Sequence, residues 1–186
     1  MSLLFTRRKS VFIAGTAILG AVVVVLDLGV RLKVPFPPLG FMKVDVLGIP
    51  MMLSYFLFGF VSGFITSLVA WLSISSRDAF SGFMKFAAEF STIVGVYIVL
   101  RARNPSNAWW KALAMVSGVL TRVVVMAIAN IMLLPVFMPA FYATYDAVIV
   151  LVPLISLFNA IQGAVSVFGG FLFYEAVVIR LPSLKH

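Results

Sequence analysis

Three side-chain amides are the residues of this sequence best suited to binding a ligand. Asn130 lies in one long apolar stretch, and Asn159 and Gln162 lie three residues apart in the next. Residues three apart on a helix share one face. Because each carboxamide offers both donors and acceptors, the three amides suit a heteroaromatic ligand with imide-like edges. The alternative is structural, since Asn and Gln often bond across membrane helices.

Three charged residues within apolar stretches also call for partners. Lys85 and Glu89 are four residues apart, which predicts an ion pair along one helix face; Lys85 is in addition a candidate ligand contact. Arg122 lies about ten residues, hence about 15 Å, into its helix. A charge at that depth needs a water-filled cavity or a partner, for which Glu89 and Glu175 are the candidates. We interpret Arg122 as structural or conformational.

Catalytic chemistry finds little support. The chain has no cysteine, its single histidine is the last residue, and its six carboxylates lie mostly at helix ends. Zinc-protease, serine-hydrolase and phosphate-loop motifs are absent from the sequence. We therefore predict a non-enzyme with no catalytic residues, no metal ligands and no cofactor.

The composition places the chain in a lipid bilayer. Hydrophobic residues make up 63% of the 186 residues and charged residues 11%, and the mean hydropathy is +1.16. Soluble domains are roughly 45–50% apolar and about 25% charged, and a chain of this length has too much surface to hide such an excess. The basic residues behind the net charge of +8 are scattered at helix ends, so we expect no nucleic-acid partner.

The apolar stretches predict an all-α membrane protein, a six-transmembrane-helix bundle that forms one domain over residues 1–186. The expected helices cover about residues 11–30, 46–59, 61–74, 83–100, 112–134 and 147–179. Since a span takes about 20 residues, the stretch 46–74 is either one tilted helix or two short ones. Its central glycines favour two helices that meet in a tight turn around Gly59–Gly63.

The distribution of charge supports six spans and predicts their orientation. With six spans, both termini share a side with residues 101–111, and that side holds eight basic residues and one acidic residue. The opposite side holds five basic and four acidic residues. Because basic residues accumulate on the cytoplasmic side, we expect a multi-pass protein of the cell membrane with both termini in the cytoplasm.

The segment between the first two predicted helices, Arg31 to Asp45, contains three prolines that limit its freedom. We expect it to form a loop that caps an outward-facing pocket, with Phe36 or Phe41 stacked on a ligand ring. The alternative is a surface loop whose aromatic side chains anchor at the membrane interface.

The first predicted helix carries a pattern of small residues four apart, Ala17 and Ala21. Small residues at this spacing let another helix approach closely. The approaching helix belongs either to the same bundle or to another protein.

Three segments carry a resemblance to a known family. The first runs from Lys43-Val-Asp45 through Ile49-Pro50 to Phe58-Gly-Phe-Val-Ser-Gly63, the second from Arg122-Val-Val-Val-Met126 through Asn130 to Leu133-Leu-Pro135, and the third is Phe158-Asn-Ala-Ile-Gln162-Gly163. Together they resemble the substrate-binding S-components of energy-coupling factor (ECF) vitamin transporters, most closely the riboflavin-specific members. The resemblance covers about Ala14 to Tyr174, and its first segment recurs among S-components for other vitamins.

This resemblance implies a subunit without ATPase activity that captures riboflavin, as a transported ligand, from outside. Ala17 and Ala21 match the family's docking motif for a transmembrane T-component, and two cytoplasmic ATPases would then drive release inside. Asn130 and Asn159 match positions that hydrogen-bond the flavin ring system. Gln162 stands where the family has lysine, so it keeps hydrogen bonding but lacks the charge.

Two alternatives remain open at this point. An S-component for a different vitamin or precursor would keep the fold. A non-transporting membrane assembly partner would use the amides only to join helices.

Overall fold

The structure is a computed structural model that describes residues 2–30, 33–102, 107–139 and 144–181. Its elements in chain order are α1 (Ser2–Val25), the π-helical turn η1 (Leu26–Val30), β1 (Lys33–Phe36), β2 (Leu39–Asp45), α2 (Gly48–Phe58), α3 (Phe60–Ser75), α4 (Ala79–Ala102), α5 (Ala108–Phe137) and α6 (Tyr145–Arg180). The six predicted helices are confirmed, although α1 begins at Ser2 instead of near residue 11.

Four helical segments are long and apolar enough to cross a membrane: Lys9–Gly29, α4, α5 and α6. The helices α2 and α3 have 11 and 16 residues, or about 17 and 24 Å at 1.5 Å per residue. Neither therefore crosses a hydrocarbon layer of about 30 Å alone. The six predicted helices thus comprise four of membrane-spanning length and two shorter ones.

The two short helices reverse direction at Gly59. This residue follows α2 and precedes α3 with φ 89° and ψ −175°, a conformation that essentially only glycine adopts. Ser54 Oγ in α2 lies 2.6 Å from Ser62 Oγ in α3, so the helices fold back on one another. Thr16 Oγ1 in α1 lies 2.6 Å from the same Ser62 hydroxyl. The predicted tight turn is confirmed, with Gly63 already inside α3.

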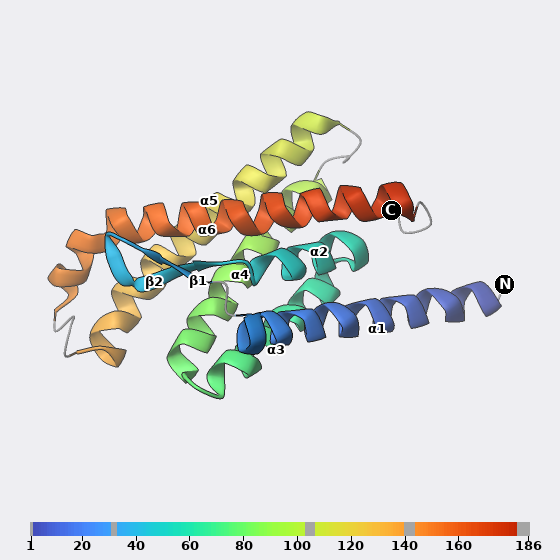
Figure 1. Ribbon diagram of the computed structural model, residues 1–186. Helices are drawn as coiled ribbons and strands as arrows, with labels where there is room; N and C mark the ends of the chain where they lie inside the picture. The colour runs from blue at the N-terminus through green and yellow to red at the C-terminus, as the bar shows by residue number, and fades with distance from the viewer. Residues whose placement is uncertain (1, 31–32, 103–106, 140–143, 182–186) are drawn as a thin grey trace.

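The arrangement of the long helices agrees with an even number of crossings. In Figure 1, α6 and α1 lie on opposite sides of the view with α2 between them. The start of α1 and the end of α6 lie at the same end of the bundle. The hairpin formed by β1 and β2 lies at the opposite end, beside the start of α6; we call this the hairpin end.

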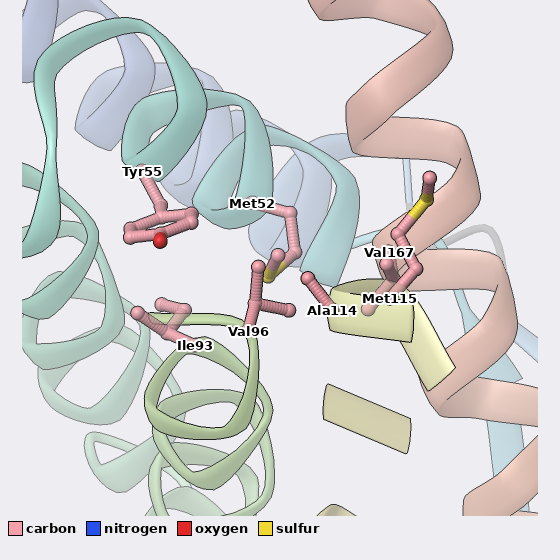
Figure 2. Close-up of a cluster of buried hydrophobic side chains, with 7 residues drawn as sticks. All are labelled: Met52, Tyr55, Ile93, Val96, Ala114, Met115 and Val167. Atoms are coloured by element: carbon pink, nitrogen blue, oxygen red, sulfur yellow. The ribbon is translucent and has the colours of Figure 1, made fainter. Parts of the chain in front are cut away.

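A buried cluster packs four of the helices together. Figure 2 shows its seven side chains, Met52 and Tyr55 from α2, Ile93 and Val96 from α4, Ala114 and Met115 from α5, and Val167 from α6. Glycine brings α4 and α5 especially close, because a Cβ atom on Gly95 would lie 2.8 Å from Gly118 Cα. Small residues at such crossings are typical of membrane helix packing.

From Lys33 to Asp45 the chain forms a two-stranded hairpin, where the sequence predicted a loop. The strands pair antiparallel, with Lys33 opposite Asp45. Pro35 fits because each strand of a two-stranded sheet is an edge strand. Phe36 and Leu39 flank the turn and are buried against side chains of α5 and α6. The hairpin is therefore packed onto the bundle.

A buried carboxylate secures the base of the hairpin. Asp27 in η1 is fully buried, and its oxygens lie 2.6 Å from Arg77 Nη2 and 3.4 Å from Lys33 Nζ. Ser73 Oγ in α3 donates a hydrogen bond to the same carboxylate at 2.8 Å. These bonds join the end of the first helix to β1 and to the end of α3.

We expect Gly59→Ala to lower the free energy of unfolding by about 1–3 kcal/mol, because an L side chain is strained at this positive φ. Thermal unfolding of the purified protein in detergent measures the effect. Gly40→Ala is the matched control, since a Cβ atom at Gly40 meets no other atom within 4 Å. Equal thermal unfolding midpoints for the two variants would contradict the view that the positive φ of residue 59 requires glycine.

Candidate functional site

A cavity of about 220 Å³ lies between β2, α4, α5 and α6. Its apolar lining comprises Met42, Phe80, Met84, Ala88, Met126, Leu134, Met138 and Phe158. Its polar lining comprises Lys43, Asp45, Ser81, Lys85, Arg122, Asn130, Asn159 and Gln162. The mixture of flexible thioethers, aromatic rings and a few polar groups is typical of a small-molecule site.

The wall supplied by α5 follows from a simple spacing. Arg122, Met126, Asn130 and Leu134 recur every fourth residue, and all four are buried and line the cavity. Side chains four apart lie above one another on the same helix face. Since α5 ends at the hairpin end (Figure 1), Asn130 lies nearer that end and Arg122 lies deeper in the bundle.

The start of α4 is held in place by Asp78, whose carboxylate accepts hydrogen bonds from the Phe80 and Ser81 backbone N–H groups and the Ser81 hydroxyl. The Ser81 side-chain hydrogen bond contributes most to lowering the pKa of the Asp78 carboxyl below its usual value. This cap fixes Phe80 and Ser81, both of which line the cavity.

Both asparagines lie where a ligand can reach them, and both also make structural bonds. Asn130 Nδ2 donates to the Met126 carbonyl at 2.6 Å, and no described residue donates to its Oδ1. Asn159 Nδ2 donates to the Ile155 carbonyl at 2.9 Å, and its Oδ1 accepts from Arg122 Nε at 3.3 Å. Asn130 therefore presents a carboxamide oxygen without a described partner, whereas Asn159 joins α6 to α5.

The amide of Gln162 is engaged by the hairpin. Its Oε1 accepts from the Asp45 backbone N–H at 2.9 Å, and its Nε2 donates to the Asp45 carbonyl at 2.8 Å and to Asp45 Oδ1 at 3.3 Å. Gln162 lines the cavity, but these bonds use both ends of its amide. It closes the wall between α6 and β2.

Four charged side chains form a network at the deep end of the cavity. Lys85 Nζ lies 2.7 Å from Asp45 Oδ1 and 3.1 Å from Glu89 Oε1, and Arg122 Nη1 lies 2.8 Å from Glu89 Oε1. Ser166 Oγ donates to the same Glu89 oxygen at 3.3 Å. The two cations and two carboxylates balance one another, which allows Glu89 and Arg122 to be buried and Lys85 and Asp45 to be half-buried in lipid-embedded protein.

This network confirms one prediction and decides another. The predicted Lys85–Glu89 pair is present. The partner of Arg122 is Glu89; the other candidate, Glu175, lies 3.6 Å from Lys111 Nζ instead. Sequence reasoning missed Asp45 as the second partner of Lys85, because nothing local links residues 40 positions apart.

Arg122 has a partner and also lines the cavity, the two alternatives that its depth in the helix offered, but sequence reasoning did not place it among the candidate ligand contacts. Its step of eight residues to Asn130 places both on one face of α5, and this spacing is the signal that would have found it.

The two aromatic candidates in the hairpin stay predictions. Phe36 is 8% exposed and its ring lies 5.6 Å from the Phe158 ring. It supports a cavity-lining residue and is not itself among the lining residues. Phe41 lies in β2, and its side chain lies outside the described part of the chain.

The small-residue pattern of α1 points away from the bundle. Ala17 and Ala21 are exposed. Their neighbours Thr16 and Gly20 are buried, Thr16 against Ser62 and Gly20 beside Val69. Ala17 and Ala21 therefore leave a shallow face that another protein or lipid can approach.

Comparison with known proteins gives a match in fold. No protein-family model and no curated protein sequence matches the chain. A solved structure described as the S component of a bacterial ECF transporter is similar, with a TM-score of 0.77 and 24% sequence identity. The alignment covers 93% of this chain and 98% of that chain. The predicted all-α, six-helix membrane bundle is therefore confirmed.

We expect Gln162→Met to lower the free energy of unfolding by about 1–3 kcal/mol, because it removes the bonds to Asp45 and leaves the partly buried backbone N–H and carbonyl of Asp45 without these partners. The thermal midpoint in detergent measures this loss. Ile161→Met, at a neighbouring position that is 40% exposed, serves as the control. If both variants melt together, the bonds to Asp45 do not stabilise the hairpin.

Proposed function

We propose that this chain is the substrate-capture subunit of an ECF-type vitamin importer and that it binds riboflavin. The observation that carries the proposal is a cavity lined by Asn130 and Asn159 in a bundle similar in fold to an ECF S component. The three sequence segments that resemble riboflavin-specific S-components support the choice of ligand, because two of them contribute these asparagines.

The lining suits a flat ligand with a polar edge. Met126 and Phe158 offer apolar surface for ring atoms, and Asn130 Oδ1 offers an acceptor for a ring N–H or a hydroxyl group. Burial of the rings would supply most of the affinity, and the amides would fix the orientation.

The cavity is smaller than the roughly 300–1,000 Å³ of typical ligand pockets, at about 220 Å³. We therefore expect the hairpin and the start of α4 to move apart when a three-ring ligand with a ribityl chain enters. Both border the cavity, through Met42 and Phe80 respectively.

The proposed orientation places both termini in the cytoplasm and the hairpin end outside. It is supported by the excess of basic residues near the termini and by the common location of the start of α1 and the end of α6 (Figure 1). The cavity would then receive its ligand from outside, beside the hairpin.

The proposed partners are a transmembrane T-component, which would dock on Ala17 and Ala21, and two cytoplasmic ATPases. The exposure of both alanines on α1 supports this surface. Hydrolysis of ATP by the partners would provide the free energy for release, so this chain needs no catalytic site.

Riboflavin binding is tested by titration of the purified protein with riboflavin while flavin fluorescence is followed. We expect a dissociation constant below about 1 µM, or about −8 kcal/mol. Asn159→Ala and Asn130→Ala should each bind about tenfold more weakly, because each removes a group that fixes the ligand.

Asn107→Ala is the control, since Asn107 is exposed and caps α5 away from the cavity. No response to riboflavin but tight binding of another vitamin would favour an S-component of different specificity. Binding of no vitamin would favour the assembly-partner alternative.

Docking is tested by co-purification with the T-component and ATPases of the same organism. We expect Ala17→Leu with Ala21→Leu to abolish co-purification and leave riboflavin affinity unchanged, because the larger side chains block close approach of a helix. Ala112→Leu, on the exposed face of α5, is the control. Retention of the complex by the double variant would contradict docking through α1.

A further inference from the structure

The deep end of the cavity contains an arginine whose hydrogen-bonding capacity is only partly used. Arg122 is 2% exposed and lines the cavity. A guanidinium group carries five N–H donors. Its Nη1 donates to Glu89 and its Nε donates to Asn159, while no described residue accepts a hydrogen bond from Nη2. Donors therefore remain at a buried position beside an open space.

The guanidinium is held rigidly. Glu89 in α4 fixes one side of the group at 2.8 Å, and Asn159 in α6 fixes another at 3.3 Å. Gly163 permits this position, because a Cβ atom there would lie 3.0 Å from Arg122 Cδ. A donor fixed from two sides loses little conformational freedom when a ligand binds.

Neighbouring groups at this end also present donors. Asn159 Oδ1 already accepts from Arg122, and Asn159 keeps one N–H that it does not use on Ile155. The second oxygen of Glu89 is buried without a described partner and lies on the Gly48 side, outside the cavity lining. A ligand group that meets Arg122 and Asn159 must therefore be an acceptor.

The charge balance determines what kind of acceptor fits. Glu89 pairs with Arg122, and Asp45 pairs with Lys85. Because these four charges already balance one another, a further negative charge would be buried without a counter-charge of its own, at a large desolvation cost. An uncharged carbonyl oxygen accepts the free N–H without that cost.

We propose that Arg122 is a specificity-determining residue that donates from Nη2 to an uncharged carbonyl oxygen of the ligand, with Glu89 and Asn159 as its positioning residues. The proposal rests on the proposed function, and it adds a contact that neither the amides nor the ion pair requires. In riboflavin the acceptor is one of the two carbonyl oxygens of the pyrimidine ring. This ring edge then lies deepest in the bundle, below Asn130.

The first test is Arg122→Lys, which keeps the positive charge beside Glu89 but loses the planar guanidinium group and its fixed N–H donors. We expect riboflavin to bind about tenfold to a hundredfold more weakly. Arg77→Lys is the matched control, because Arg77 also pairs with a buried carboxylate, Asp27, but is not a cavity-lining residue. It should retain wild-type affinity.

The second test keeps the protein unchanged and alters the ligand. In 2-thioriboflavin and 4-thioriboflavin a sulfur atom, a weak acceptor, replaces one carbonyl oxygen. We expect one analogue to bind the wild-type protein about tenfold more weakly than riboflavin, and Arg122→Lys to reduce that preference. A merely structural arginine would not change discrimination between two ligands of similar shape.

The outcomes separate the two proposals. Absence of riboflavin binding by the wild-type protein would overturn the proposed function and this contact together. Riboflavin binding with equal affinity for both thio-analogues would overturn the contact alone, even where Arg122→Lys does not fold. Unchanged affinity in a folded Arg122→Lys variant would overturn it as well.

Discussion

The site depends on the pairing of four charges in a protein surrounded by lipid, two of them buried (Glu89 and Arg122) and two half-buried (Asp45 and Lys85). Asp45, Lys85, Glu89 and Arg122 come from β2, α4 and α5, and a lone charge among them would carry a large desolvation cost. The pairs at 2.7, 3.1 and 2.8 Å remove that cost only when the three elements lie in one relative position. The same requirement that makes the charges tolerable therefore sets the shape of the cavity beside them.

The hairpin illustrates how one residue can connect a whole segment between two helices to this network. Asp45 ends β2, accepts a hydrogen bond from the Leu47 backbone N–H, pairs with Lys85 and bonds Gln162 through its backbone. A segment that the sequence presents as a proline-containing loop is thus joined to α4 and to α6. The cover of the cavity and the charge network respond together to any change at Asp45.

The features that sequence reasoning predicted are those that depend on near neighbours in the chain. Helix positions follow from apolar runs, the reversal from Gly59, and the Lys85–Glu89 pair from a spacing of four. The bonds between Asp45 and Gln162 join residues 117 positions apart, and no local pattern specifies them. The hairpin pairs residues no more than 12 positions apart, but its three prolines favoured a loop over strands. Arg122 lies between these cases, because its depth predicted a partner or a cavity but did not predict that it would share the lining with the asparagines.

The choice between structural amides and ligand-binding amides, which the sequence left open, proves to be too simple. A buried amide must satisfy at least part of its hydrogen-bonding capacity within the protein, or the empty site would carry an unpaired group. Asn130 and Asn159 each use one N–H on the carbonyl four residues earlier, which holds each side chain in a single orientation. The groups that remain are an oxygen and one N–H on Asn130 and one N–H on Asn159, whose oxygen already accepts from Arg122, so Asn130 is the better acceptor of the two. A pair of amides tethered in this way distinguishes the two edges of a ligand, which freely rotating amides would not do.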